Sequence, residues 1–135
     1  MAISPTQKKR ELYSDFRKDL LVSPVNFDLA RKTNEEAVKE SILNLILTDR
    51  GERFFQPNLG SDIRSMLFEN VTNLTILTIE EMVKDVIESY EPRAGLISVE
   101  TTPNTDGNEI NLTITFNVSN SEEDIVLTTT LSRVR

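Results

Sequence analysis

The chain has 135 residues, a formal net charge of −7 and a hydrophobic share of 38%, which fits one domain with an aliphatic core. The acidic surface argues against nucleic-acid binding, and no apolar run approaches the roughly 20 residues that cross a bilayer. The absence of Cys and His excludes disulfides, thiol catalysis and the commonest zinc ligand and general base. We therefore expect no cofactor, metal, nucleic acid, membrane or small-molecule substrate.

Residues 1–32 form a mildly basic segment without a sustained helical or strand period, and Pro5 and Pro24 interrupt it. Large apolar side chains are spaced along it, namely Leu12, Tyr13, Phe16, Leu20, Leu21, Val25 and Phe27. One interpretation is a frayed tail, and the other is an extended arm that docks on a neighbouring molecule. We favour the arm, because a merely solvated tail seldom carries so many large apolar residues.

The first predicted helix runs from Asn34 to about Asp49, with a capping box at Thr33 and Glu36 and a stop at Gly51. Its apolar residues occupy two sides, with Val38, Ile42, Leu45 and Ile46 on one and Leu43 and Leu47 on another. Such a wide apolar surface fits burial between the sheet and the other helices, or packing of one flank against a partner helix.

Residues 51–60 form a connector that glycine and proline punctuate. A short helix is predicted from Ile63 to about Glu69, and a third helix from about Thr75 to Tyr90. The apolar stripe of the third helix indicates packing on a sheet. Pro92 disfavours α-helical geometry at the preceding residue and so ends this helix.

Three strands are predicted next, at Leu96–Thr101, Glu109–Val118 and Ile125–Ser132. The second alternates apolar and polar residues, so one face is buried and the other is wet. A turn at residues 104–107 favours an antiparallel meander. The predicted fold class is α+β, with two to three helices packed on this three-stranded meander.

The predicted organisation is an extended N-terminal arm at residues 1–32 and a single domain at residues 33–135. A three-stranded meander has two edge strands, whose unpaired amide and carbonyl groups can pair with another chain. The first and third strands are the expected edges. Partner contacts are predicted at Leu96, Val99, Ile125, Leu127 and Leu131 of these strands, and at Leu43 and Leu47 of the first helix.

The tripeptide Glu91-Pro92-Arg93 connects the third helix to the first strand. Pro92 fixes the backbone direction, Glu91 can pair with a local cation, and Arg93 presents a planar fork to a carboxylate. We expect a rigid corner that holds the helix against the strand. Glycoside hydrolysis would need a buried acid of raised pKa, whereas a cation so close to Glu91 lowers its pKa.

Together these features resemble the small baseplate wedge, or sheath-initiator, protein family of contractile-tailed T4-like phages, which is related to the baseplate subunit of type VI secretion systems. The resemblance covers about Asn34 to Arg135. It is carried by Gly51-x-Arg53, Pro57, Gly60, Asp62, Leu67-Phe68-Glu69-Asn70 and Tyr90-Glu91-Pro92-Arg93. It assigns the structural motif of the family to Glu91, Pro92, Arg93, Gly51 and Arg53.

The resemblance implies a structural, non-enzymatic component of the virion tail baseplate that is assembled in the host cytoplasm. It implies larger baseplate wedge proteins and the tail sheath protein as partners, and initiation of the contractile sheath by β-strand augmentation with the first sheath ring. The alternative is an acidic lysozyme-like muramidase, a label that some family members have carried. That alternative requires Glu91 or another glutamate as a buried acid, and the sequence offers no convincing acid and nucleophile pair.

Overall fold

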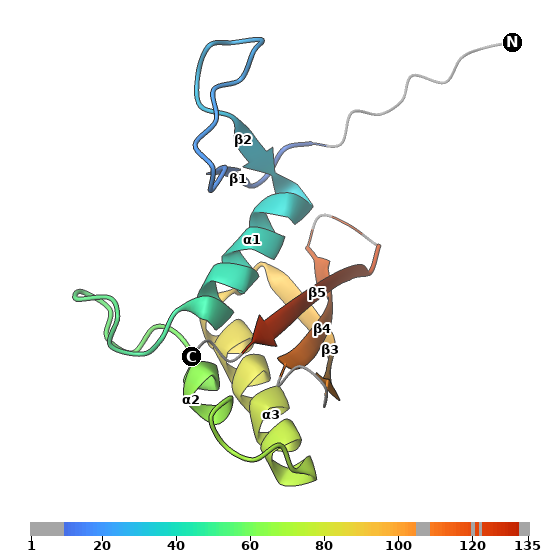
Figure 1. The fold of residues 1–135 in the computed structure, drawn as a ribbon. Coiled ribbons are helices and arrows are strands. Elements are labelled where there is room, and N and C mark those ends of the chain that lie inside the picture. Colours follow the sequence, from blue (N-terminus) through green and yellow to red (C-terminus); the bar gives the residue numbers. More distant parts are fainter. Residues whose placement is uncertain (1–9, 105–108, 120, 122, 133–135) are drawn as a thin grey trace, which may run out of the picture.

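The computed structural model describes residues 10–104, 109–119, 121 and 123–132. The elements in this part of the chain are β1 (Ser14–Phe16), β2 (Arg31–Thr33), α1 (Asn34–Leu47), α2 (Ile63–Met66), α3 (Asn73–Tyr90), β3 (Ala94–Asn104), β4 (Glu109–Val118) and β5 (Ile125–Ser132). The last three strands form an antiparallel sheet in the order β3-β4-β5. Helices cover one face of this sheet (Figure 1), which confirms the predicted α+β class and meander.

The core lies between this sheet and the two long helices. The central strand β4 turns every second side chain inward, and each of these is at most 2% exposed: Ile110, Leu112, Ile114, Phe116 and Val118. Helix α3 packs against β3, and α1 packs across β4 and β5. Apolar residues at helical spacing on α1 and α3 complete the core, including Val38, Ile42, Ile46, Ile79, Val83 and Ile87.

Helix α1 begins at the predicted residue but without the predicted capping box. Thr33 is the N-cap, yet its side chain makes no capping hydrogen bond. The physical reason is that Thr33 belongs to β2, where it pairs with Ser14, and that Asn34 adopts a left-handed φ of 48°. The helix ends at Leu47, before the predicted end, because the chain turns into a parallel bridge between Asp49 and Ser61.

The other two helices differ from prediction mainly at their ends. Helix α3 begins at Asn73, earlier than expected, because the Thr72 hydroxyl accepts the Thr75 amide at 3.2 Å and caps it. Helix α2 is shorter than predicted. After Met66 the chain continues to Glu69 through i to i+3 hydrogen bonds, which is turn geometry rather than α-helix.

The segment before α1 contains structure that the sequence does not predict. Strands β1 and β2 pair antiparallel, and Val22 and Leu29 form a further bridge, so the chain doubles back on itself. We call residues 10–33 the N-terminal ribbon. Figure 1 shows it standing beyond the N-terminal end of α1. The expected turn at residues 104–107 falls largely outside the described residues, and the division into an arm and a domain stays a prediction.

Candidate functional site

One edge of the sheet, the outer edge of β3, is closed to further pairing. The Thr101 amide donates to Glu80 Oε1 of α3 at 2.8 Å, so it is already satisfied. Two residues further along the same edge, Pro103 has no amide hydrogen. A bulge at Ile97 also interrupts the regular register of this strand. These are the devices by which natural proteins prevent an edge strand from pairing.

The opposite edge, on β5, is open. In an antiparallel sheet successive residues turn their amides to alternate sides. The Thr101 amide points away from β4, so its partner Leu112 turns toward β5, and Thr129, which faces Leu112, turns back toward β4. The neighbours Thr128 and Thr130 therefore turn their amides outward. Within the described residues, no hydrogen bond satisfies these outward amides.

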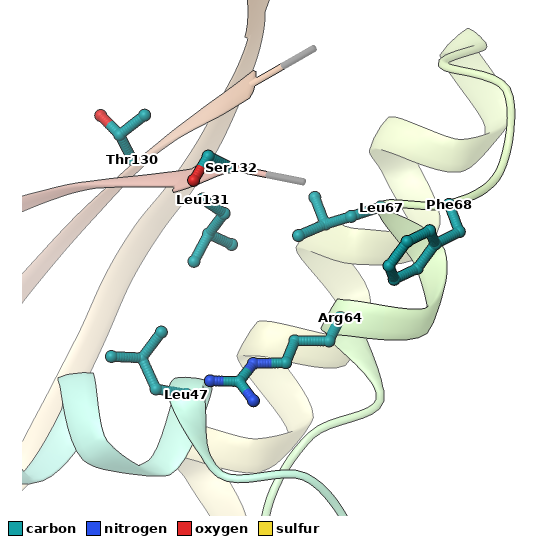
Figure 2. A pocket seen from close by; sticks show the side chains of 7 residues that line it. All are labelled: Leu47, Arg64, Leu67, Phe68, Thr130, Leu131 and Ser132. Atoms are coloured by element: carbon teal, nitrogen blue, oxygen red, sulfur yellow. The ribbon is translucent and has the colours of Figure 1, made fainter. Parts of the chain in front are cut away.

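An apolar pocket of about 520 Å³ lies beside the C-terminal half of β5. We call it the β5 groove, and it is lined by Leu47, Arg64, Leu67, Phe68, Thr130, Leu131 and Ser132. Figure 2 shows Leu131 pointing from the strand toward Leu47, while Leu67 reaches in from the segment after α2. The fold thus places unpaired backbone next to an apolar depression.

The residues predicted to contact partners on β3 and β5 are mostly buried or half-buried, and the other two lie on α1. Ile125 and Leu131 are buried in the core, and Leu127 packs against it. Leu96 and Val99 are half-buried and line a second pocket of about 400 Å³ between α3 and β3. Of the α1 pair, Leu47 lines the β5 groove, while Leu43 is half-buried outside the lining of both pockets. What β5 offers a partner is therefore mainly its backbone.

The corner after α3 is fixed by a buried ion pair. Glu91 is 2% exposed, and Arg93 donates two hydrogen bonds to its two carboxylate oxygens, at 2.6 and 2.7 Å. The planar guanidinium matches both oxygens at once, which makes this contact stronger than a single charged hydrogen bond. The exposed Pro92 lies between the two residues, so the turn from helix to strand is clamped from both sides.

The electrostatics of this corner argue against acid catalysis. Burial raises the pKa of Glu91, but hydrogen bonds from Arg93 and Ser41 and the charge of Arg93 outweigh it. The resulting pKa of Glu91 lies below its ordinary value, so the group stays ionised at neutral pH. A general acid for glycoside hydrolysis needs the opposite shift.

The same corner also contacts the N-terminal ribbon. The Arg93 guanidinium lies 5.5 Å from the centre of the Tyr13 ring, within the range of a cation–π contact. Tyr13 itself is half-buried and packs against the core. Glu91 therefore orients Arg93, and Arg93 in turn contacts the residue that immediately precedes the first strand of the ribbon.

A second anchor for the ribbon is the Asn34 side chain at the start of α1. Its Oδ1 accepts the amides of Leu12 and Tyr13 at 2.9 and 3.3 Å, and its Nδ2 donates to the Arg10 carbonyl at 3.2 Å. The Asn34 amide donates to the Tyr13 carbonyl at 2.8 Å. This one residue, which has a left-handed φ, thus satisfies several backbone groups in the segment just before β1.

Beyond these anchors the ribbon exposes an unusual amount of apolar surface. Val25 and Phe27 near its tip are 82% and 86% exposed. Large apolar residues along its length are also exposed, namely Leu12, Phe16, Leu20, Leu21, Val22 and Leu29. Leu20 and Phe27 have φ values of 49° and 54°, a conformation that costs a residue with a side chain about 1–2 kcal/mol. Exposed apolar side chains gathered on one segment make it a candidate interaction surface.

The two remaining motif residues lie where α1 leads into the following loop. Gly51 has a φ of 83°, a conformation that suits glycine, and its amide donates to the Pro57 carbonyl at 2.8 Å. Arg53 is exposed, and its guanidinium forms no hydrogen bond or ion pair with the described part of the chain. Gly51 thus shapes the loop, whereas the Arg53 side chain makes no polar contact that would stabilise the described part of the fold.

No group of three or more carboxylates within the described ranges could hold a metal ion. None of the helices in that part of the chain is both long enough and apolar enough to span a bilayer.

Together, the fold and the site define a small α+β protein with one open sheet edge, a corner fixed by an ion pair and exposed apolar side chains. The family model for baseplate wedge protein gp25 matches residues 32–123. The chain belongs to this family. Membership confirms the predicted resemblance and the predicted location in the virion tail baseplate.

Relatives support the same assignment. The chain is 34% identical over 115 residues to baseplate wedge protein gp25 of Enterobacteria phage T4, covering 85% of this chain and 86% of that protein. A crystal structure of a protein from Geobacter sulfurreducens, described as a candidate tail lysozyme, is similar with a TM-score of 0.68 and 29% identity, over 75% of this chain and 92% of that one. A chain of the baseplate complex from the type VI secretion system shares the fold, with a TM-score of 0.61 and 17% identity, over 71% and 90% of the two chains.

Sequence reasoning missed three residues that shape this site. Glu80 reads as a solvent-facing helix residue, and its hydrogen bond to β3 depends on tertiary packing. Asn34 reads as the first residue of a helix, and its contact with the ribbon is seen only in the hydrogen bonds of its side chain. Tyr13 reads as one apolar residue among several in the arm. Its contact with Arg93 joins residues far apart in the sequence, so no local pattern pointed to it.

Proposed function

We propose that this protein is a structural component of the tail baseplate that starts the contractile sheath by accepting a β-strand from the first sheath ring. The observation that carries the proposal is the open outer edge of β5 beside the β5 groove. A strand that pairs with β5 gains main-chain hydrogen bonds and a defined register. The closed edge of β3 supports β5 as the edge that receives it.

The β5 groove supports the proposal in a second way. A strand added to β5 places alternate side chains on the helix-covered side of the sheet. On that side the groove offers Leu47, Leu67 and Leu131 to an apolar side chain. Backbone pairing would provide affinity, and the groove would select which residue of the incoming strand sits there.

The N-terminal ribbon is proposed to join this protein to larger baseplate wedge proteins. Its exposed apolar residues and its two left-handed residues, Leu20 and Phe27, support this role. The anchors at Asn34 and Arg93 hold its base, so its tip stands away from the body (Figure 1). The ribbon and the β5 edge would then serve different partners.

A structural role is also favoured over muramidase activity. The pKa of Glu91 is lowered rather than raised, and its two oxygens are engaged by Arg93. Purified protein assayed on peptidoglycan, with Glu91→Gln as the control, tests this point. We expect no release of muropeptides by either protein, and activity that Glu91→Gln abolishes would favour the enzyme.

The decisive experiment is electron cryomicroscopy of the assembled tail end. We expect a strand of a sheath subunit hydrogen-bonded to β5, and wedge proteins packed against residues 10–33. A solvent-exposed β5 edge, or one covered by this same chain, would contradict strand addition. If β5 is paired but residues 10–33 contact no other protein, only the proposed role of the N-terminal ribbon would be contradicted.

A further inference from the structure

The loop between α1 and α2 carries two adjacent aromatic side chains at its tip. Phe54 and Phe55 are 98% and 101% exposed, more than any other large apolar residue that the structure describes. Neither lines the β5 groove. Aromatic residues that protrude in this way are typical anchors of protein interfaces, where they fill pockets on the partner. We call residues 53–55 the aromatic finger.

The loop that presents the finger is held in one conformation. The Gly51 amide donates to the Pro57 carbonyl at 2.8 Å and closes its base. The Tyr90 hydroxyl of α3 donates to the Asn58 carbonyl, also at 2.8 Å. At Gly60 a Cβ atom would collide with a backbone carbonyl oxygen, so the path of the chain there requires glycine. A preorganised loop loses little conformational entropy on binding.

The charges around the finger indicate what it contacts. Arg50 pairs with Asp62 at 3.6 Å, and the Glu52 carboxylate accepts the Asp49 amide at 3.1 Å, so both are engaged locally. Arg53 has no such contact with the described residues. The finger therefore combines two exposed rings with one cation that makes no ion pair within the described residues. A complementary surface is an apolar socket that carries a carboxylate at its rim.

We propose that Phe54 and Phe55 insert into an apolar socket on another baseplate protein, where a carboxylate pairs with Arg53. This inference rests on the proposed function, since it assumes a baseplate partner. A second copy of this chain is a poor candidate, because two copies that each carry a net charge of −7 repel one another. The finger thus fixes the protein in the baseplate, separately from the β5 edge.

The test is a phage that lacks its own copy of this chain and is supplied with the double variant Phe54→Ser/Phe55→Ser. We expect at least tenfold fewer copies of the chain in purified baseplates, measured by quantitative mass spectrometry. The melting temperature of the isolated variant should match the wild type, because neither ring contributes to the core. Incorporation within twofold of wild type would overturn the proposal.

Two controls separate this inference from the proposed function. Leu74→Ser removes another exposed apolar residue, which is 74% exposed at the start of α3, and should leave incorporation unchanged. A variant that blocks the β5 edge should be incorporated normally yet fail to start a sheath. If that variant supports a normal sheath, the proposed function fails while the finger stands.

The chemistry of the socket can be tested directly. A photo-crosslinking phenylalanine analogue at position 54 should label a peptide of a different baseplate protein, and that peptide should contain apolar residues and a carboxylate. Arg53→Glu should reduce incorporation severalfold, while Arg53→Lys keeps most of it. Labelling of a second copy, of a sheath subunit or of no protein would contradict the assignment.

Discussion

The two edges of the sheet differ in whether their outward-pointing backbone amides are free to pair. On β3 a glutamate side chain occupies the Thr101 amide and a proline removes the next outward amide, whereas on β5 the outward amides of Thr128 and Thr130 have no partner among the described residues. Both strands are edges of the same three-stranded meander. The difference supports the proposal that the sheet accepts a strand on the β5 side, while the β3 side is protected from pairing.

The largest expected effect comes from closing the open edge. Thr128→Pro removes one outward amide of β5, at a place where proline does not break the bond to β4. We expect at least a hundredfold loss of sheathed tails, counted by electron microscopy, with normal amounts of the chain in the baseplate. Thr128→Val keeps the amide and the shape of the side chain, so it should support normal sheaths. Equal loss in both variants would show that the side chain matters and not the backbone.

A second large effect is expected at the corner that positions β3. Glu91→Ala leaves the half-buried Arg93 without its carboxylate and should lower the free energy of unfolding by about 2–4 kcal/mol. Chemical denaturation measures this change. Glu88→Ala, at an exposed position on α3, should change stability by less than about 0.5 kcal/mol. A loss below about 1 kcal/mol at Glu91 would mean that packing alone holds the corner.

Opening the closed edge should have a smaller effect on stability and a visible effect on association. Glu80→Ala frees the Thr101 amide, so we expect a loss of about 1–2 kcal/mol and concentration-dependent self-association. Light scattering measures the association. The neighbouring substitution Glu81→Ala should change neither the stability nor the self-association of the protein. A monodisperse Glu80→Ala protein would show that the bulge and Pro103 suffice to close β3.

The smallest expected effect is a pH dependence of the corner. The pKa of Glu91 is lower in the folded protein, so the unfolded chain takes up the proton first. The contribution of the ion pair is therefore complete above the ordinary carboxyl pKa of about 4.3 and declines as the pH falls below it. Urea unfolding across this range should give a stability difference between wild type and Glu91→Gln that shrinks in acid. A stability difference that stays constant with pH would contradict the lowered pKa of Glu91.

Much of the fold follows from patterns that the sequence displays openly. The alternation along β4 and the helical spacing on α3 gave the right elements, because each reflects burial on one face only. Pro92 marked the end of α3 correctly. Such signals are local, since they depend on periodicity and on one residue with a fixed φ.

The parts that could not be predicted depend on contacts distant in sequence. The pairing of β1 with β2 rests on a strand of three residues and on Asn34, which bonds to residues 21 and 22 positions away. The closing of β3 depends on Glu80, which looks like any exposed helical glutamate. The edge strands could be expected from the meander, but which of them is open was visible only after α3 was placed.

The length of helix α1 sets the distance between two of the surfaces proposed to bind other baseplate proteins. Its 14 residues span about 21 Å, and Figure 1 shows the ribbon beyond one end and the loop with the aromatic finger beyond the other. Two weak contacts, one by the ribbon and one by the finger, strengthen each other when their spacing is fixed. The first contact to form raises the local concentration of the second. Only a baseplate surface with both binding sites at the matching distance would then engage both contacts. Copies bound elsewhere would make one weak contact and would dissociate before any sheath subunit arrives.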